Sequence, residues 1–363
     1  MKLQVTQENL NQALNSVARV ANSRNTLPIL SNVLIKTTNN RLSLSATNLD
    51  IAIVHYIGAK ISEEGAITVP ARLMQDFVSN LPAGVIELEL TNTKLKVNTE
   101  QYHSVVNGIV ADDFPVMPLI SEGKTWKISS SVLKKGLQQT VFAASSDETR
   151  QVLTGVYLHS KAGKLYVAAT DSYRLAEKEL AKNNEEVSIL VPASAMSDLL
   201  RIMGDYDGEI SVTHDGQQVL FRVGDVELTA RLVEGSYPDY QKLIPEQFSS
   251  SIELKKTDLI NVARVSSLFA RESAGSVTIE LDDKTNSLSI RSVASQLGEN
   301  TATSNGKVSG SGSITLNSRY LLDGLQALSG EEVYFGFNGK LEPTILKDPK
   351  DSSYKHIIMP LKS

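Results

Sequence analysis

The segments GAITVPARLMQDFVSNL (residues 65–81) and VSILVPASAMSDLLRIM (residues 187–203) repeat one pattern with different letters. Each begins with alternating apolar residues that end at Val-Pro, and proline is favoured at a helix start because its missing N–H would have no partner there. An apolar stripe at i, i+3, i+4 and i+7 follows: Met74, Phe77, Val78 and Leu81 in the first segment, and Met196, Leu199, Leu200 and Met203 in the second. This spacing predicts a strand that runs into an amphipathic helix, twice in one chain.

A third, weaker copy of the pattern is GSITLNSRYLLDGLQAL (residues 312–328). Its stripe is formed by Leu321, Leu325 and Leu328, whereas Asn317 replaces the proline and Gly324 interrupts one apolar position. The copies recur at a spacing of roughly 120 residues, and self-similarity at a fixed period indicates tandem structural units.

The remaining segments follow the same period. A short strand and a helix are predicted at 3–14, 126–137 and 252–263, and Thr6 and Thr257 are candidate helix starts. A β-hairpin is predicted after each of them, at 33–47, 156–170 and 277–293.

The pattern as a whole predicts an α+β fold of three tandem copies of one domain, each with two helices packed on antiparallel sheets. We place the domains at 1–122, 123–247 and 248–363, with links near 121–126 and 245–251.

Composition excludes several classes of protein. The 363 residues are 41% hydrophobic, and no apolar run is long enough to span a bilayer. No signal peptide opens the sequence, and the absence of cysteine removes disulfides, thiolate metal sites and cysteine nucleophiles. The net charge of −5 argues against a whole surface that coats nucleic acid, although a local basic face remains possible. We therefore expect a cytoplasmic protein without membrane contact.

No stretch predicts a metal site or a cofactor site. The five histidines lie far apart in the sequence, without metal-ligand spacing. Gly123-Lys124-Thr125 lacks the leading glycine and the strand of a phosphate loop, so we interpret it as an interdomain turn. SGSGS (309–313) contains an isolated G-x-G and is predicted to be a flexible loop.

The hairpin of the second copy differs from the other two at AATDSYRLAEKEL (168–180). The first copy has SATNLDIAIVHYI at this place and the third has RSVASQLGENTAT. On the residues alone, the stretch predicts a turn in which Asp171 bonds its own backbone and Arg174 pairs with a neighbouring carboxylate.

Seven short motifs give the chain a family resemblance over almost its whole length. They are RNTLPILSNVLI (24–35), TNLDIAI (47–53), TVPAR (68–72), ADDFP (111–115), TDSYRLA (170–176), EGSYPDY (234–240) and IIMPLKS (357–363). In these motifs and their order the chain resembles the bacterial sliding clamps, the beta subunits of DNA polymerase III.

The resemblance implies a homodimeric ring through which double-stranded DNA passes without sequence-specific contacts. It implies no bond chemistry and no cofactor, and an ATP-driven clamp loader as the partner that opens the ring. It also implies that the third domain of one subunit contacts the first domain of the other. Leu268 and Phe269 match the apolar pair at this contact, although ordinary helix-end packing inside the third domain would also account for them.

DNA contacts are expected from the predicted helices, where eight basic and six acidic residues give a net charge of +2, against −5 for the chain. A small positive charge suits a ring that slides on phosphates. Arg24 matches a DNA-contacting arginine of the family. With it, the candidate DNA-binding residues are Arg24, Arg72, Lys134, Lys135, Arg201, Arg264 and Arg319.

Peptide binding is the second activity that the resemblance implies, with short peptides of the replicative polymerase, the clamp loader and repair polymerases as ligands. The motifs assign the pocket to Leu153, Thr170, Ser172, Tyr173, Arg174, Leu175, Pro238, Lys242, Leu243, Ile357, Met359, Pro360 and Leu361. Arg174 and Lys242 are expected to meet peptide carbonyls or acids at the rim. Ser172-Tyr173 replaces the Gly-His of the best-known clamps, and the ending Leu361-Lys362-Ser363 also departs from them, so the peptide preference stays open.

Two other functions are compatible with some of these features. A hydrolase would need a triad assembled from distant positions, and no motif favours one. A monomeric peptide-binding scaffold would share the pocket but would neither dimerise nor encircle DNA.

Overall fold

The computed structural model describes residues 1–21, 27–115, 120, 122–183, 185–296 and 298–361. They form two compact units, one of residues 1–131 with 197–232 and one of residues 132–196 with 233–363. The second copy of the sequence pattern is therefore divided between the two units.

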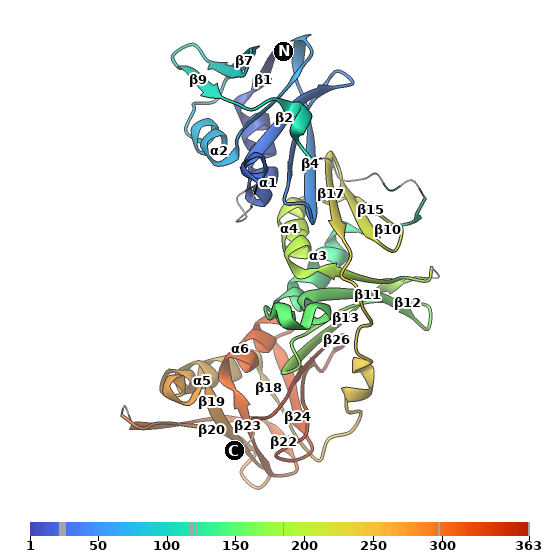
Figure 1. Ribbon diagram of the computed structural model, residues 1–363. Helices are drawn as coiled ribbons and strands as arrows, with labels where there is room; N and C mark the ends of the chain where they lie inside the picture. Colours follow the sequence, from blue (N-terminus) through green and yellow to red (C-terminus); the bar gives the residue numbers. More distant parts are fainter. Residues whose placement is uncertain (22–26, 116–119, 121, 184, 297, 362–363) are drawn as a thin grey trace. The chain divides into compact units, whose positions relative to one another are not determined.

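Within the described residues, the first unit contains two antiparallel sheets and the helices α1 (Gln7–Ala21) and α2 (Ala71–Ser79), which lie side by side (Figure 1). The larger sheet has the order β10-β15-β16-β17-β4-β3-β2-β6, and the smaller has the order β5-β1-β7-β8-β9. The strand bounds are β1 Lys2–Thr6, β2 Asn32–Thr38, β3 Arg41–Thr47, β4 Ile51–Gly58, β5 Lys60–Glu63, β6 Ala66–Pro70, β7 Val85–Thr91, β8 Lys94–Asn98, β9 His103–Asn107, β10 Lys124–Ser129, β15 Glu209–His214, β16 Gln218–Val223 and β17 Val226–Arg231.

The second unit contains the sheets β14-β11-β12-β13-β26-β25-β24-β18-β22 and β21-β20-β19-β23. The strand bounds are β11 Gly155–Lys161, β12 Lys164–Thr170, β13 Arg174–Lys182, β14 Ser188–Pro192, β18 Ser250–Lys255, β19 Ser276–Asp282, β20 Ser287–Ala294, β21 Gly298–Asn305, β22 Lys307–Ser309, β23 Gly312–Asn317, β24 Glu332–Phe337, β25 Thr344–Asp348 and β26 Asp351–Ile358. Its helices α5 (Lys256–Phe269) and α6 (Ser318–Ala327) pack against each other. The chain passes between the units within α3 (Ser130–Thr140), within α4 (Ala193–Met203) and again after Leu232.

The order strand, helix, hairpin, strands and helix occurs three times, which confirms the predicted fold of three tandem α+β copies. The first hairpin turns through Asn39 and Asn40, with φ of 47° and 60°, and the second turns through Ala162 and Gly163, with φ of 50° and 74°. Left-handed residues at both central positions match the right-handed twist of the flanking strands, so the same short turn recurs.

Strands of successive copies pair with each other. In the first unit β4 of the first copy pairs with β17 of the second, and in the second unit β13 of the second copy pairs with β26 of the third. The third-copy counterpart of β4 and β13 is β21, which is an edge strand. The first-copy counterpart of β17 and β26 is β9, which is also an edge strand.

The helix stripes are buried with two exceptions. Met74, Val78, Met196, Leu199 and Met203 are buried, as are Leu321, Leu325 and Leu328. Phe77 and Leu200 are only half-buried. The prolines are the last residues of strands β6 and β14, so they stand just before the helices and not inside their first turn.

The contacts of Asn317 and Gly324 account for the two departures of the third copy from the pattern. The Asn317 side chain accepts hydrogen bonds from the backbone N–H of Arg319 and Tyr320, so it caps α6 where the other copies have proline. A Cβ atom on Gly324 would lie 2.4 Å from Cδ2 of His356, so glycine makes room for a buried ring.

Several local predictions were wrong. Thr6 Oγ1 accepts from Asn9 N at 3.4 Å, but Thr257 caps nothing, because α5 begins at Lys256 and the Thr257 hydroxyl contacts Asp258. β10 begins at Lys124, so Lys124 and Thr125 belong to a strand and not to a turn, and Gly123 precedes that strand. SGSGS is not a flexible loop over its whole length, because Ser309 ends β22 and Gly312 begins β23, so only Gly310 and Ser311 lie between the strands.

Candidate functional site

The turn at residues 170–174 is built by local hydrogen bonds. Asp171 Oδ1 accepts from the N–H of Tyr173 and Arg174, each at 2.9 Å, and Thr170 Oγ1 donates to Arg174 O at 2.6 Å. Ser172 stands at φ +76°, a left-handed conformation that non-glycine residues seldom adopt. The predicted self-bonded turn is confirmed, and it displays the Tyr173 ring with 56% of its surface exposed.

The Arg174 side chain is only 10% exposed and its guanidinium is fully engaged. It contacts Asp171 Oδ2 at 3.1 Å and Asp323 Oδ2 at 2.6 Å, and it donates to Phe142 O at 2.7 Å. Its Cζ lies 5.3 Å from the Phe142 ring centre and 4.6 Å from that of Tyr320. Charge-assisted bonds of this kind are among the strongest in proteins. The guanidinium therefore ties the turn to α6, and the expected contact of Arg174 with a peptide at the rim stays a prediction.

Residues that are far apart in sequence meet here because β13 pairs with β26. Leu175 stands opposite Ile357, and both belong to a buried cluster with Ala168, Tyr240 and Ile345. Next to this cluster, Met359 N donates to Tyr173 O at 2.8 Å. The final segment thus lies against the turn.

The final segment also closes the third copy, as the simpler interpretation of IIMPL predicted. Leu361 N donates to Thr315 O of β23 at 2.8 Å. Met359, Pro360 and Leu361 are half-buried, so parts of their side chains remain accessible. The closing role is confirmed, and the peptide-pocket role of the segment stays a prediction.

The segment 237–243 lies on the sheet through stacked rings. Tyr157 stacks on Tyr237 and His159, with ring centres 4.8 Å and 4.7 Å apart, and His159 Nε2 lies 2.7 Å from Tyr240 Oη. Burial raises the pKa of Tyr240 and lowers that of His159, so both are neutral near pH 7. This anchor presents Leu243, which is 55% exposed, together with the exposed Pro238 and Lys242. Lys242 pairs with Asp239 at 2.8 Å, and this pair is largely exposed.

Leu153 is buried at the end of the 3-10 helix η4 (Glu148–Thr154). Sequence reasoning missed its neighbour Arg150, which donates to Ser172 Oγ at 3.1 Å and lies 3.4 Å from Asp147. It also missed Asp323, Phe142, Tyr320 and the tyrosine anchor. The two tyrosines of EGSYPDY were a signal in the sequence for the anchor alone.

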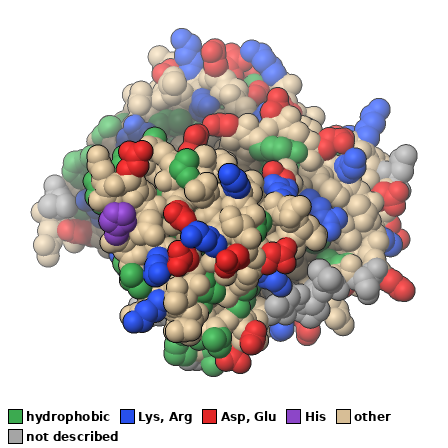
Figure 2. Space-filling view, turned by 90° about the horizontal axis from the view of Figure 1, so that it is seen from above, with side chains coloured by type: hydrophobic (Ala, Val, Ile, Leu, Met, Phe, Trp, Pro, Cys, Tyr) green, Lys and Arg blue, Asp and Glu red, His purple; other side chains and the backbone are tan. Residues whose placement is uncertain are grey.

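The candidate DNA-binding residues are exposed, with exceptions. Arg72, Lys135, Arg201, Arg264 and Arg319 are exposed, Lys134 is half-buried, and Arg24 lies outside the described residues. Arg72 is 3.9 Å from Asp76, and Arg201 is 2.9 Å from Asp198. On the face that Figure 2 presents, basic side chains lie among acidic ones.

The predicted contact pair lies at the end of α5. Leu268 is 49% exposed and Phe269 is half-buried. Packing inside the third copy therefore leaves much of the Leu268 side chain uncovered.

Among the described residues there is no group of three or more His, Asp and Glu side chains able to hold a metal ion. The same part of the chain contains no helix long and apolar enough to cross a membrane.

Comparison with known proteins gives three family matches in sequence order. Family models for the DNA polymerase III beta subunit match as the N-terminal domain at residues 1–118, the central domain at 127–239 and the C-terminal domain at 241–362.

Individual relatives match along the whole chain. The beta sliding clamp of Synechococcus elongatus is 34% identical, with 100% of this chain and 99% of the relative covered. A crystal structure of the Bacillus subtilis sliding clamp superposes with a TM-score of 0.94 at 28% identity, covering 100% of this chain and 99% of that one. The Bartonella birtlesii sliding clamp, solved with griselimycin bound, gives a TM-score of 0.95 at 29% identity and full coverage of both chains. The chain therefore belongs to the family of bacterial beta sliding clamps, the beta subunits of DNA polymerase III.

Proposed function

We propose that this chain is a DNA sliding clamp: a homodimeric ring that encircles double-stranded DNA and tethers the replicative polymerase. The observation that carries the proposal is a pair of edge strands without a neighbour on one side, β9 in the first copy and β21 in the third.

Each link between copies within the chain uses the same kind of strand pair. Leu228 of β17 stands opposite Ile53 of β4, and Ile357 of β26 stands opposite Leu175 of β13, both antiparallel. By the same rule β9 should pair with β21, but each is an edge strand of its own sheet within the described residues. An open edge is a hazard unless another chain pairs with it.

Two copies of the chain satisfy both edges at once. If β9 of each subunit pairs with β21 of the other, the two contacts are head-to-tail and the assembly closes. The exposed apolar side chains agree with this arrangement, since Val105 of β9 is 58% exposed and Leu268 of α5, which packs on β21, is 49% exposed. These exposed edges disfavour the alternative of a monomeric scaffold.

A closed ring holds DNA by topology, so its contacts with phosphate can stay weak. The mixed charges around Arg72 and Arg201 suit such sliding, because strong phosphate binding would require many uncompensated cations. We assign these two, with Arg24, Lys134, Lys135, Arg264 and Arg319, to DNA contacts that read no base sequence. A clamp loader with ATP is the expected partner for opening the ring.

Peptides of the polymerase, the clamp loader and repair polymerases are proposed to bind over the cluster of Leu175 and Ile357. Exposed Tyr173 and Leu243 flank it, and Met359 adds a flexible side chain that can adapt to different ligands. The bound griselimycin in the Bartonella birtlesii relative supports a ligand site in a clamp of this kind. We propose no bond chemistry for the protein and no cofactor, and we expect it to act in the cytoplasm with the replication machinery.

The mass in solution tests the dimer. Sedimentation equilibrium should give about twice the 39.5 kDa of the chain. Val105→Asp and Leu268→Asp should each shift the mass towards that of the monomer, because each buries a charge at the proposed contact. Leu341→Asp, at a loop residue that is 69% exposed, is the matched control and should remain dimeric. A monomeric wild-type chain would overturn the ring.

A further inference from the structure

The strand that opens each copy has the same place in its sheet, but its surroundings differ between the copies. β1, β10 and β18 each run directly into the first helix of their copy, and each pairs antiparallel with the strand that follows the second helix, which is β7, β15 or β24. On its other side β1 also pairs with β5, and β18 also pairs with β22. Among the described residues β10 has no second neighbour, so it forms an edge of its eight-stranded sheet.

Two short strands cover this edge in the other copies, and they have nearly the same sequence. β5 begins with Lys-Ile-Ser at residues 60–62, and β22 is Lys-Val-Ser at residues 307–309. Both run antiparallel to the opening strand. Ile61 and Val308 are half-buried, while the lysines and serines beside them are exposed. A strand added at this place therefore has a β-branched apolar residue between two polar ones.

The register of these strands can be transferred to β10. Ile61 stands opposite Leu3, and Val308 stands opposite Ile252. Leu3, Trp126 and Ile252 hold the same position, because each stands three residues before the end of its strand. A β-branched apolar residue of an added strand would therefore stand opposite Trp126, which is buried.

The next position of β10 carries a different charge from its counterparts. Lys60 stands opposite Gln4 in the first copy, and Lys307 stands opposite Glu253 in the third. The corresponding residue of β10 is Lys127, whose side chain is 65% exposed. Like charges directly opposite each other destabilise a strand pair, whereas opposite charges stabilise it. An added strand should therefore have Asp or Glu at this position, where the other copies have lysine.

The lysines of β10 also indicate what kind of chain can bind. The ion pair of Lys127 with Glu209, at 3.4 Å, is largely exposed on both sides, so it holds Lys127 only weakly. Lysine on an edge strand hinders pairing with an identical edge, and two β10 strands would bring Lys124 and Lys127 of both chains together. The edge thus favours an acidic strand of another protein over a second copy of this chain.

The chain's own segment after β13 is held elsewhere. β5 and β22 follow β4 and β21, which are the counterparts of β13 in the other copies. After β13, however, Asn183 N donates to Gly163 O at 2.9 Å, and Val187 N donates to Ser160 Oγ at 3.0 Å. These bonds fix the segment to the hairpin of β11 and β12, and its described residues add no strand to β10.

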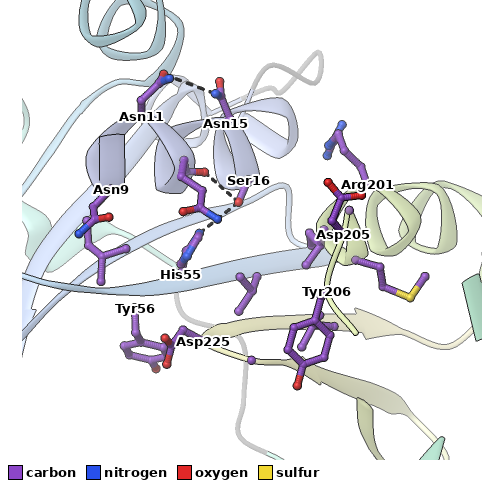
Figure 3. Close-up of a pocket in the computed structure, with 18 of the residues that line it drawn as sticks. Asn9, Asn11, Asn15, Ser16, His55, Tyr56, Arg201, Asp205, Tyr206 and Asp225 are labelled. Carbon is purple, nitrogen blue, oxygen red and sulfur yellow. Dashed lines mark hydrogen bonds between the residues drawn. The ribbon is translucent and has the colours of Figure 1, made fainter. Parts of the chain in front are cut away.

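The sheet that carries β10 is tied to its surroundings at several places. Arg41 Nη1 contacts Asp225 Oδ1 at 2.8 Å, which links β3 to the turn between β16 and β17. In the pocket beside this turn, His55 Nδ1 lies 3.1 Å from Ser16 Oγ and so links β4 to α1 (Figure 3). A preformed edge favours binding, because little of the protein has to be ordered when a strand is added.

We propose that the edge of β10 binds an extended acidic segment of a partner protein as an added antiparallel strand. The segment would place Asp or Glu opposite Lys127, Ile or Val opposite Trp126, and a polar residue opposite Thr125, in this order from its N-terminus. Backbone hydrogen bonds would supply the affinity, and these side chains the specificity. The proposal concerns β10 alone and depends neither on ring closure nor on the peptide site over Leu175 and Ile357.

Energy transfer from Trp126, the single tryptophan of the chain, to dansyl-labelled peptides tests this edge. One peptide has Glu-Val-Ser at its centre, and the other has Lys-Val-Ser in the same flanking sequence without tryptophan. In titrations of the full chain at low ionic strength, wild type should bind the Glu peptide about fivefold more tightly, because an ion pair replaces a like-charge pair. Lys127→Glu should reverse this preference.

Two further variants make the test decisive. Lys94→Glu is the matched control, since Lys94 is exposed on β8, which already has β7 and β9 as neighbours, and it should keep the wild-type preference. Lys127→Gln should bind both peptides equally, and it decides the question if Lys127→Glu does not fold.

The proposal is overturned if wild type binds neither peptide or binds both equally, or if the Lys127 variants keep the wild-type preference. It is also overturned if Lys94→Glu changes the preference as much as Lys127→Glu does, because net charge and not the edge would then select the peptide. Assembly of the chain beyond a dimer, with neither peptide bound, would assign the edge to a second copy instead.

Discussion

Residues 47–51 and 170–174 form the same turn in two copies of the repeat, but only the second turn contains a charged network. Leu49 and Ser172 occupy the same left-handed position, with φ of 78° and 76°. The first turn ends in Ile51, which is buried in an apolar environment, whereas the second ends in Arg174 with its two carboxylate partners. The repeat thus fixes the backbone of the turn, and a few side chains give one copy a charged network that the other lacks.

The largest effect is expected from removing the charge that distinguishes the second turn. Arg174→Ala leaves Asp171 and Asp323 without their partner, and breaking a buried pair in this way costs about 3–5 kcal/mol of unfolding free energy. Urea unfolding measures the loss. Arg222→Ala removes an exposed arginine that pairs with Glu227 and should cost no more than about 1 kcal/mol. Equal losses of unfolding free energy in the two variants would show that the Arg174 network stabilises the fold no more than an exposed ion pair does.

Peptide affinity tests whether the second turn carries the binding site. Met359→Ala with Leu361→Ala should weaken binding of a polymerase peptide by about 2 kcal/mol, because apolar contacts over the Leu175 and Ile357 cluster are lost. The dimer mass should not change. Leu49→Ala, in the equivalent turn of the first copy, is the matched control. Unchanged affinity of the double variant would remove the site assignment.

Gly324 tests the packing beneath the turn. Gly324→Ala should destabilise the second unit by about 1–3 kcal/mol, because the new Cβ would crowd His356. Gly58→Ala is the comparison in the first unit, since a Cβ there meets no atom within 4 Å. Thermal unfolding of both variants measures the change in stability. Similar losses of stability in the two variants would contradict the steric explanation.

The pH dependence of stability should reflect the same buried ring. Burial lowers the pKa of His356 to about 3, so below pH 6.5 the unfolded chain binds a proton that the folded chain does not. The unfolding free energy should therefore fall as the pH drops from about 6.5 towards 3, by up to about 1.4 kcal/mol per pH unit for this group. His356→Gln should reduce the slope, whereas the exposed His103→Gln should not. A slope that His356→Gln leaves intact would contradict this origin.

Much of the fold could be predicted because the same spacings of apolar residues occur three times in the sequence. The hairpins and both helices of each copy follow from apolar spacing, and the self-bonded turn follows from Asp171. Pairing across copies could not be predicted, since nothing local to β13 specifies β26 as its neighbour. The partners of Arg174 were missed for the same reason, because Asp323 lies 149 residues away and meets it only through that pairing. Ser309 and Gly312 looked like a flexible loop because their strand character comes from neighbouring strands and not from their own propensity.

Retention on DNA tests the central claim most directly. The dimer would be loaded by a cognate clamp loader with ATP on a nicked circle, and retention at high salt would be compared before and after linearisation. A topological hold predicts that the clamp stays on the circle and leaves only the linear molecule, because salt weakens phosphate contacts equally on both. Equal loss from both forms, with a control clamp loaded successfully, would contradict encirclement.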